Sequence, residues 1–220
     1  FSEEGSGQDH YRDFIDQHGY DYIAATHGER SEFYYIPQPS QLPERLHHTK
    51  WVGDRTLDFL DRRDSSCPFF CWTSFIKPHP PFESPVPWNR LYRMIEMDLT
   101  YIPPDNDQLL TYWNRLQNRY KYRDQGLDLN LVRVMKAAYY AAISFIDYNV
   151  GRILNQLEDE GILDETLILF TSDHGEFLGD YNCYGKRSFL DSAARIPLLV
   201  RYPTRFTPNT LCDQPVSLVD

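Results

Sequence analysis

The strongest pattern in the sequence is a run of apolar residues at three- and four-residue steps between positions 131 and 160. These residues are Leu131, Val134, Met135, Ala138, Ala142, Phe145, Ile146, Val150, Ile153, Leu154 and Leu157. Their spacing places them on one face of a long helix, which Gly161 would end. Three short apolar segments, 68–76, 166–170 and 196–202, have the composition of buried strands. Strands around such a helix predict an α/β fold, with a mostly parallel central sheet and helices on both faces.

The rest of the chain carries shorter signals. Residues 9–18 have the spacing of a short amphipathic helix, and residues 49–63 predict a second helix with Thr49 as its N-cap. Residues 31–50 are polar and contain prolines, which favours a loop. The segment 77–129 has weak periodicity. A loop of this length is usually functional, and its middle has room for a short helix.

Length and charge narrow the class of protein. The 220 residues suffice for one core, so length alone predicts a single domain across 1–220. The net charge of −10 argues against nucleic acid as a partner. No apolar stretch approaches the roughly 20 residues of a membrane span, and the first residues lack the features of a signal peptide. The four cysteines lack zinc-site spacing and are expected as free thiols, so the compartment stays undetermined.

An aspartate and a histidine closely follow the strand-like segment 166–170. Asp173 and His174 stand where the carboxyl end of a strand meets a turn, and Gly175 permits that turn to be tight. A carboxylate oxygen with a neutral imidazole suits a divalent cation such as Ca²⁺ or Mn²⁺ better than structural zinc. The alternative is a capping aspartate beside a surface histidine. Because Ca²⁺ takes about six to eight ligands, other groups must complete such a site.

A lysine and a histidine follow the strand-like segment 68–76. Lys77 and His79 each precede a proline, which pushes both residues into extended conformations. Residues two apart in an extended chain face the same side, so both side chains are expected to present together at the end of a strand. The alternative is a rigid proline loop with two solvated side chains.

A third loop at the end of a strand contributes Lys186, which follows Gly185 and precedes the segment 196–202. Alone it would be interpreted as a surface lysine. Beside a metal ion, however, cationic donors stabilise an oxyanion while its negative charge grows. The three loops together therefore favour a site that binds an oxyanion.

Three segments resemble the sulfatase family of the alkaline phosphatase superfamily, and they occur in that family's order. They are "PFFCWTSFIKPHPPF", "AAYYAAISFIDYNVGRILNQLEDEGILDET" and "TLILFTSDHGEFLGD" with the "GK" and "ARIPLLV" that follow it. The stretch "LHHTKWVGDRTLDFLD" is most similar to choline-sulfatase-like and phosphonate monoester hydrolase-like members. The resemblance implies an alkaline phosphatase-like sandwich.

The resemblance also implies a role for each matching residue. Asp173 and His174 would be ligands of the catalytic divalent metal, with Ca²⁺ as the first choice and Mn²⁺ or Mg²⁺ as alternatives. Lys186 would contact the sulfate or phosphate oxygens. His79 would protonate, or hydrogen-bond to, the leaving oxygen, and Lys77 would touch the substrate.

The family's nucleophile is not among these residues. It is a formylglycine made from the cysteine or serine of a Cys/Ser-x-Pro-x-Arg motif, and none of Cys67, Cys71, Cys183 and Cys212 stands in that context. The resemblance places this motif, with the first metal-binding strand, N-terminal to Phe1. The sequence starts without methionine and stops at "PVSLVD", where family members usually continue. The resemblance therefore implies a single, partial catalytic domain across 1–220, and we interpret the sequence as an internal piece of a larger enzyme.

The expected function is the metal-dependent hydrolysis of sulfate esters by the parent enzyme, with the isolated chain inactive. A phosphonate monoester or phosphodiester hydrolase on the same scaffold is the first alternative. A non-catalytic fragment that binds a metal or a partner is the second. The expected substrate is a small anionic sulfate, phosphate or phosphonate ester, and a homo-oligomer stays open.

Overall fold

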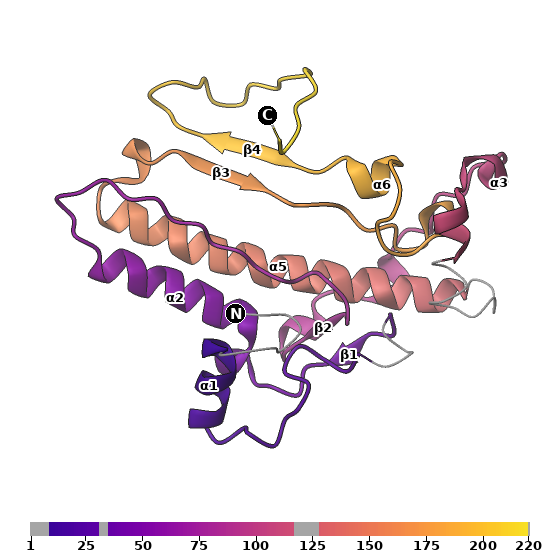
Figure 1. Cartoon of the computed structure of the whole chain (residues 1–220), viewed down its shortest axis with the longest axis horizontal. Helices are drawn as coiled ribbons and strands as arrows, with labels where there is room; N and C mark the ends of the chain where they lie inside the picture. Colours follow the sequence, from indigo (N-terminus) through magenta and orange to yellow (C-terminus); the bar gives the residue numbers. More distant parts are fainter. Residues whose placement is uncertain (1–8, 31–34, 117–127, 220) are drawn as a thin grey trace. The chain divides into compact units, whose positions relative to one another are not determined.

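The structure is a computed structural model that describes residues 9–30, 35–116 and 128–219 (Figure 1). It consists of two compact units: unit 1 comprises 1–99 with 126–156, and unit 2 comprises 100–125 with 157–220. The expectation of a single domain across the whole chain stays a prediction.

In the described part of unit 1 there are three α-helices. α1 (His10–Gln17) begins behind Asp9, whose carboxylate accepts a hydrogen bond from Tyr11 N at 2.9 Å. α2 spans His48–Arg62, and α5 spans Leu129–Asp159 with its last residues in unit 2. These bounds confirm the three helices that the apolar spacing predicts.

The start of α2 differs from the prediction. His47 is the N-cap, because its imidazole Nδ1 accepts a hydrogen bond from Thr49 N at 3.2 Å. A histidine ring here satisfies a helix amide in the same way as the serine or aspartate oxygens that usually do so. The prediction of Thr49 as the cap considered only side chains with an oxygen acceptor, and it is wrong.

α5 ends where the sequence predicts. Gly161 has a φ of +71°, and its N–H donates to Glu158 O at 2.8 Å, in the left-handed conformation that glycine favours at a helix end. By length and composition alone α5 could cross a membrane, although the core helix of a soluble protein has the same properties. The expectation of a chain without a membrane span stays a prediction.

α2 and α5 approach each other closely at Gly53. A Cβ atom there would lie 2.6 Å from Asn149 Oδ1, so a side chain fits only if something moves. Asn149 is fully buried, donates to Phe145 O at 2.8 Å and accepts from Arg152 Nη1 at 2.9 Å. Arg152 also donates to Asp54 of α2 at 2.7 Å. Glycine at position 53 thus lets the two helices pack around a buried polar group.

The strands form two short ladders. In unit 1, β1 (Gln38–Pro39) runs parallel to β2 (Glu83–Ser84). In unit 2, β3 (Ile168–Thr171) pairs with β4 (Leu198–Arg201) in antiparallel register, first residue opposite last. Both predicted strands of unit 2 are therefore present. Among the described residues, however, only the ladder of unit 1 has the parallel direction that was expected.

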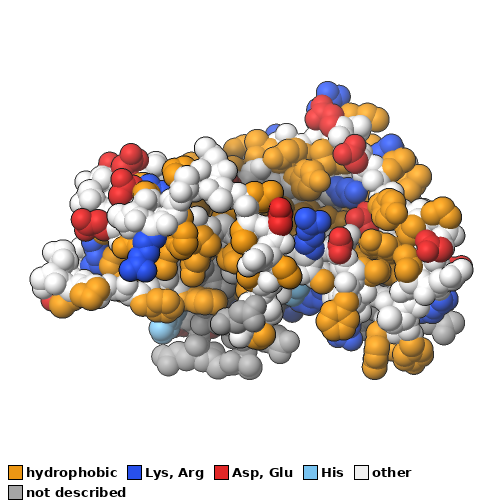
Figure 2. Space-filling view, turned by 90° about the horizontal axis from the view of Figure 1, so that it is seen from above, with side chains coloured by type: hydrophobic (Ala, Val, Ile, Leu, Met, Phe, Trp, Pro, Cys, Tyr) orange, Lys and Arg blue, Asp and Glu red, His pale blue; other side chains and the backbone are white. Residues whose placement is uncertain are grey.

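The strands are more exposed than predicted. Leu169 and Leu199 are each 62% exposed. The segment 68–76 forms no strand, and its Phe70 and Trp72 are 84% and 80% exposed. Figure 2 shows exposed apolar side chains over one face of the molecule. Apolar composition did not decide burial here, because a strand is covered only where other segments pair and stack against it.

Short helices and hydrophobic clusters are further features of the described residues. α3 (Asn106–Leu109) confirms a short helix within the long predicted loop, and α6 (Asp191–Ala194) precedes β4. Among the hydrophobic clusters are Tyr11, Ile15, Ile23, Leu42 and Leu46 in unit 1, and Phe177, Cys183 and Ala193 in unit 2. All four cysteines are free thiols, as predicted.

The contact at Gly53 predicts a difference between two glycine-to-alanine changes in helices. Gly53→Ala should lower the free energy of unfolding by about 1–3 kcal/mol, because the new methyl group collides with Asn149. Gly151→Ala is the matched control in α5, where an added Cβ meets nothing within 4 Å. It should raise the free energy of unfolding by about 0.5–1 kcal/mol. Urea unfolding followed by circular dichroism measures both, and equal gains would contradict the proposed close approach.

Candidate functional site

Asp173 and His174 follow β3 in a turn that brings their side chains together. Asp173 Oδ2 lies 3.3 Å from His174 Nε2, and Asp173 Oδ1 accepts a hydrogen bond from His174 N at 3.0 Å. The side chain of Asp173 is largely exposed and that of His174 is partly exposed. An oxygen and a nitrogen at this separation can bind one divalent cation together.

The hydrogen bonds of His174 determine which of its ring nitrogens can act as a ligand. Nδ1 lies 2.8 Å from Gly175 O, which can only accept, so Nδ1 carries the proton of the neutral ring. Nε2 then presents a lone pair, and it lies 2.5 Å from Lys186 Nζ. Metal-binding histidines usually donate their second N–H to a carbonyl or carboxylate in this way. The pair therefore fits a divalent metal.

Gly175 is required by a close backbone contact. A Cβ atom at this position would lie 2.1 Å from Ser192 O. Gly175 N also donates to Ala193 O at 2.8 Å, which ties the turn to α6. Glycine therefore allows the turn after β3 to lie directly against the chain before β4.

The loop between His174 and Lys186 is closed by Glu176. Its carboxylate accepts a hydrogen bond from Gly185 N, and Phe177 N donates to Gly185 O at 3.0 Å. These bonds return the chain to the start of the loop and place Lys186 beside His174. Glu176 was not among the predicted site residues.

The structure thus brings together three of the five predicted site residues. Asp173, His174 and Lys186 meet in unit 2, whereas Lys77 and His79 belong to unit 1. The roles assigned to all five residues stay predictions.

The segment from Lys77 to His79 is a turn. His79 N donates to Ile76 O at 3.1 Å, and the Lys77–Pro78 peptide bond is cis. Lys77 is only 3% exposed, whereas His79 is partly exposed. The prediction that both side chains present to the same side assumed an extended backbone, and it is wrong because that backbone is not adopted.

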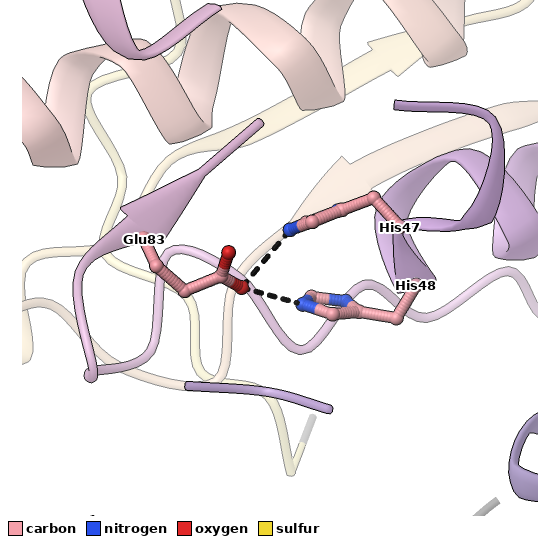
Figure 3. Close-up of side chains that lie close together, drawn as sticks. All are labelled: His47, His48 and Glu83. Atoms are coloured by element: carbon pink, nitrogen blue, oxygen red, sulfur yellow. Dashed lines mark hydrogen bonds and ion pairs between the residues drawn. The ribbon is translucent and has the colours of Figure 1, made fainter. Parts of the chain in front are cut away.

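Lys77 belongs to a buried polar cluster that the sequence reasoning missed. Its ammonium lies 3.2 Å from Glu83 Oε1, and the same oxygen lies 2.9 Å from His47 Nε2 and 3.4 Å from His48 Nε2. Figure 3 shows both imidazoles pointing at this carboxylate. The adjacent histidines in "LHHTKW" were an available signal, but Glu83 lies 36 positions beyond His47 and no local pattern links them.

Distance alone would allow this cluster to hold a metal, since the ligand atoms of His47, His48 and Glu83 lie within 4.8 Å of one another. The hydrogen bonds argue against it. His47 Nδ1 accepts from Thr49 N, so Nε2 carries the proton of the neutral ring and has no lone pair to offer. The Lys77 ammonium already neutralises the carboxylate. We therefore interpret the cluster as a buried, hydrogen-bonded ion pair.

Burial and neighbouring groups shift the pKa values in this cluster. Burial raises the pKa of the Glu83 carboxyl, but His47 and Lys77 lower it more, so that it lies well below its ordinary value of 4.5. Burial, and then His47, hold the pKa of His48 well below 6.5. Burial and the nearby Lys77 lower the pKa of His27 to about 4. The folded chain thus favours the carboxylate of Glu83 and the neutral forms of His27 and His48.

These shifts predict that the chain loses stability in mild acid. His27 and His48 bind protons less readily when folded than when unfolded, so the free energy of unfolding is highest above about pH 6.5 and falls as the pH approaches 4. Glu83 adds a further loss below about pH 4.5, because its folded pKa is also depressed. Urea unfolding between about pH 7.5 and 5 should show the first loss. His27→Gln should reduce this slope, whereas the exposed His10→Gln should not; a stability independent of pH would contradict the assignment.

Comparison with known proteins gives the family. The sulfatase family model matches residues 3–220. An arylsulfatase of Clostridium perfringens is 35% identical over 178 residues, which are 77% of this chain and 35% of that protein. A choline-sulfatase of Rhizobium meliloti is 31% identical over 165 residues, which are 71% of this chain and 32% of that protein. The chain thus spans about a third of the length of these relatives.

A solved structure supports the fold. The phosphonate monoester hydrolase of Silicibacter pomeroyi matches with a TM-score of 0.70 at 24% identity, over 88% of this chain and 41% of that one. The alkaline phosphatase-like α/β fold and the resemblance to choline-sulfatase-like and phosphonate monoester hydrolase-like members are therefore confirmed. On the match across 3–220, the chain belongs to the sulfatase family.

Proposed function

We propose that this chain carries two metal ligands and the oxyanion-binding lysine of a sulfuric ester hydrolase. The observation that supports this most is the meeting of Asp173 Oδ2, His174 Nε2 and Lys186 Nζ behind β3. A divalent cation beside an ammonium group suits an ester whose sulfate oxygens gain negative charge during the reaction. The arylsulfatase and the choline-sulfatase among the relatives support a sulfate ester as the substrate.

Asp173 and His174 would hold the divalent metal, with Ca²⁺ as the first choice and Mn²⁺ or Mg²⁺ as alternatives. A carboxylate oxygen binds all three ions, and an imidazole is a further ligand that transition metals accept. When bound, the ion would polarise an oxygen of the ester. Because Ca²⁺ takes about six to eight ligands, most of them would come from other residues, water or the substrate.

Lys186 would change its partner when the site is loaded. In the structure its ammonium lies at the lone pair of His174 Nε2, the atom through which this histidine would bind the metal. One lone pair cannot bind the metal ion and accept a hydrogen bond from the ammonium at once, and the two positive charges repel each other. Lys186 would therefore move away from His174 Nε2 when the metal binds. Its ammonium then stays close to the site and can donate to a sulfate oxygen.

His79 would donate a proton to the departing alcohol oxygen. Its Nδ1 lies 2.7 Å from Pro80 O, so Nδ1 carries the proton of the neutral ring, and Nε2 gains one only in the imidazolium form. Donation from Nε2 leaves the neutral ring behind. Such a donor typically accelerates a reaction about 10²–10⁴-fold. The contact of Lys77 with the substrate stays a prediction, and its ammonium faces Glu83 in the structure.

The nucleophile is assigned to none of these residues. In our proposal a formylglycine, supplied from outside the 220 residues, attacks the ester. The chain alone should therefore bind the metal without turning over an ester.

Metal binding by the chain tests the ligand pair. Calorimetric titration with Ca²⁺ or Mn²⁺ should show one metal site. Asp173→Asn should lower its affinity for the metal by about tenfold or more, because a charged ligand is lost. Asp213→Asn, which changes an exposed carboxylate of the same unit, should leave binding unchanged. Lys186→Met should tighten binding by roughly threefold or more, since the competing ammonium is removed. The neighbouring Arg187→Met should change binding less. Binding that ignores Asp173→Asn would rule out the pair.

Turnover by the complete enzyme that contains this chain tests the substrate class. An aryl sulfate should react faster than the matching aryl phosphonate, and His79→Gln should lower kcat by about 10²–10⁴-fold for a poor leaving group. A preference for the phosphonate would favour the phosphonate monoester or phosphodiester hydrolase instead. The isolated chain should show no turnover above buffer. Metal-dependent turnover by the isolated chain that is lost in Lys186→Ala would contradict the need for an outside nucleophile.

A further inference from the structure

Apart from the predicted substrate contact of Lys77, the buried cluster around Glu83 has no part in the roles proposed above, yet it contacts the loop that carries His79. We propose that Lys77 and Glu83 form a positioning link, which fixes the proline loop 77–83 against α2 and thereby orients the His79 imidazole. This inference rests on the proposed role of His79 as a proton donor and names the residues that hold the donor in place.

Lys77 holds the backbone of the loop from inside. Its Nζ donates to Pro81 O at 2.5 Å and to His79 O at 3.4 Å. It also donates to His27 O at 3.3 Å. A buried ammonium is held to such acceptors, because a charged donor without a partner is costly away from water. One atom therefore fixes the carbonyls on both sides of Pro80.

The carbonyl of Pro80, between these two contacts, is the acceptor for the His79 ring. His79 Nδ1 lies 2.7 Å from Pro80 O. Because the carbonyls before and after it are bound to Lys77, the Pro80 carbonyl has little freedom to turn. The imidazole is therefore held with Nδ1 toward its own loop, which leaves Nε2 as the proton-donating atom.

Glu83 attaches the end of the loop to its surroundings. Its Oε1 accepts from His47, the N-cap of α2, at 2.9 Å. Just before it, Phe82 O accepts from Gln38 N of β1 at 3.0 Å. On another side, a Cβ atom at Gly28 would lie only 3.0 Å from Glu83 Cγ. Phe82 and Glu83 thus have packed or hydrogen-bonded neighbours in α2, in β1 and at the turn of Gly28.

Stability alone does not explain a buried ion pair of this kind. Desolvation of both charges offsets much of their attraction, and replacing both partners by uncharged residues of similar size is often neutral or stabilising. Removing one partner is strongly destabilising, because the other charge is left unpaired. A charge-balanced double substitution of Lys77 and Glu83 therefore separates a positioning role from a stabilising one.

The experiment compares the wild-type chain with Lys77→Met/Glu83→Gln. Long-range proton–nitrogen NMR spectra at about pH 8.5, where imidazoles are neutral, report which ring nitrogen of each histidine carries the proton. His79→Gln identifies the signal of His79. We expect wild-type His79 to be protonated at Nδ1, and the double variant to lose this form in about half of the molecules or more.

The matched control is Arg93→Met/Glu96→Gln, which replaces the cation of an exposed ion pair of unit 1 with Met and its glutamate with Gln. It should leave the proton of the His79 ring on Nδ1, as in the wild type. A double variant of Lys77 and Glu83 that unfolds cooperatively but keeps Nδ1 protonated overturns the proposal, and so does wild-type His79 with its proton on Nε2. If the double variant does not fold, Glu83→Asp is the second variant, because it keeps both charges but draws the carboxylate away from Lys77 and His47. It should also lower the share of the Nδ1 form, and an unchanged spectrum overturns the proposal.

Turnover by the complete enzyme distinguishes this inference from the proposed function. A proton donor matters most for a poor leaving group, so His79→Ala and the double variant should each slow an alkyl sulfate at least about tenfold more than a nitrophenyl sulfate. Loss of folded enzyme would slow both equally. If His79→Ala shows no such difference, the donor role fails while the spectra still decide on the positioning link. If His79→Ala shows it and the double variant does not, the link is wrong.

Discussion

In unit 1, the positions of the proline loop and of the start of α2 depend on one oxygen, Glu83 Oε1. Donors from both parts of the chain meet at this atom. Lys77 brings the proline loop, and His47 and His48 bring the start of α2. A buried carboxylate is costly to leave partly satisfied, so the position of each donor restricts the others. The conformation of the loop that carries His79 is therefore a property of the whole cluster. A change at the first turn of α2 would reach His79 through this oxygen without any contact between them.

Local patterns predicted the elements of this fold and missed what surrounds them. The helix expected at 131–160 spans Leu129–Asp159, because its signal lies in residues three and four positions apart. The strand expected at 68–76 is absent, since a strand also needs a neighbour to pair with, and composition does not identify that neighbour. The cap of α2 shows the same limit on a smaller scale, because the choice of His47 over Thr49 depends on the direction in which an imidazole points.

The candidate site, too, has a part that local sequence patterns predict and a part that depends on contacts between distant segments. Asp173, His174 and Lys186 all lie in the connection between β3 and β4, so a short stretch of sequence contains all three, although Lys186 was expected on a separate loop. The link from His47 to Glu83 joins positions 36 apart in segments without a shared pattern, and it became visible only in the structure. The side chains of Lys77 and His79 were predicted to face one way from the preference of residues before proline, which is a local rule. The chain turns at Pro78 instead of running straight, and Lys77 is buried with the carbonyl of Pro81 as its acceptor.

The contact between Gly175 and Ser192 changes how an Asp-His-Gly signature can be used to recognise such sites. The carbonyl of Ser192 occupies the space that any Cβ atom at Gly175 would need. A glycine in third place therefore indicates a close neighbouring segment of chain as well as a tight turn. A homologue that kept the aspartate and the histidine but carried a larger residue in third place would have to move its 192–193 backbone away. That backbone continues into β4, and Ala193 packs in one hydrophobic cluster with Cys183 of the loop that carries Lys186. The sequence of such a homologue would still contain the two metal ligands, but the counterpart of Lys186 would no longer lie next to them.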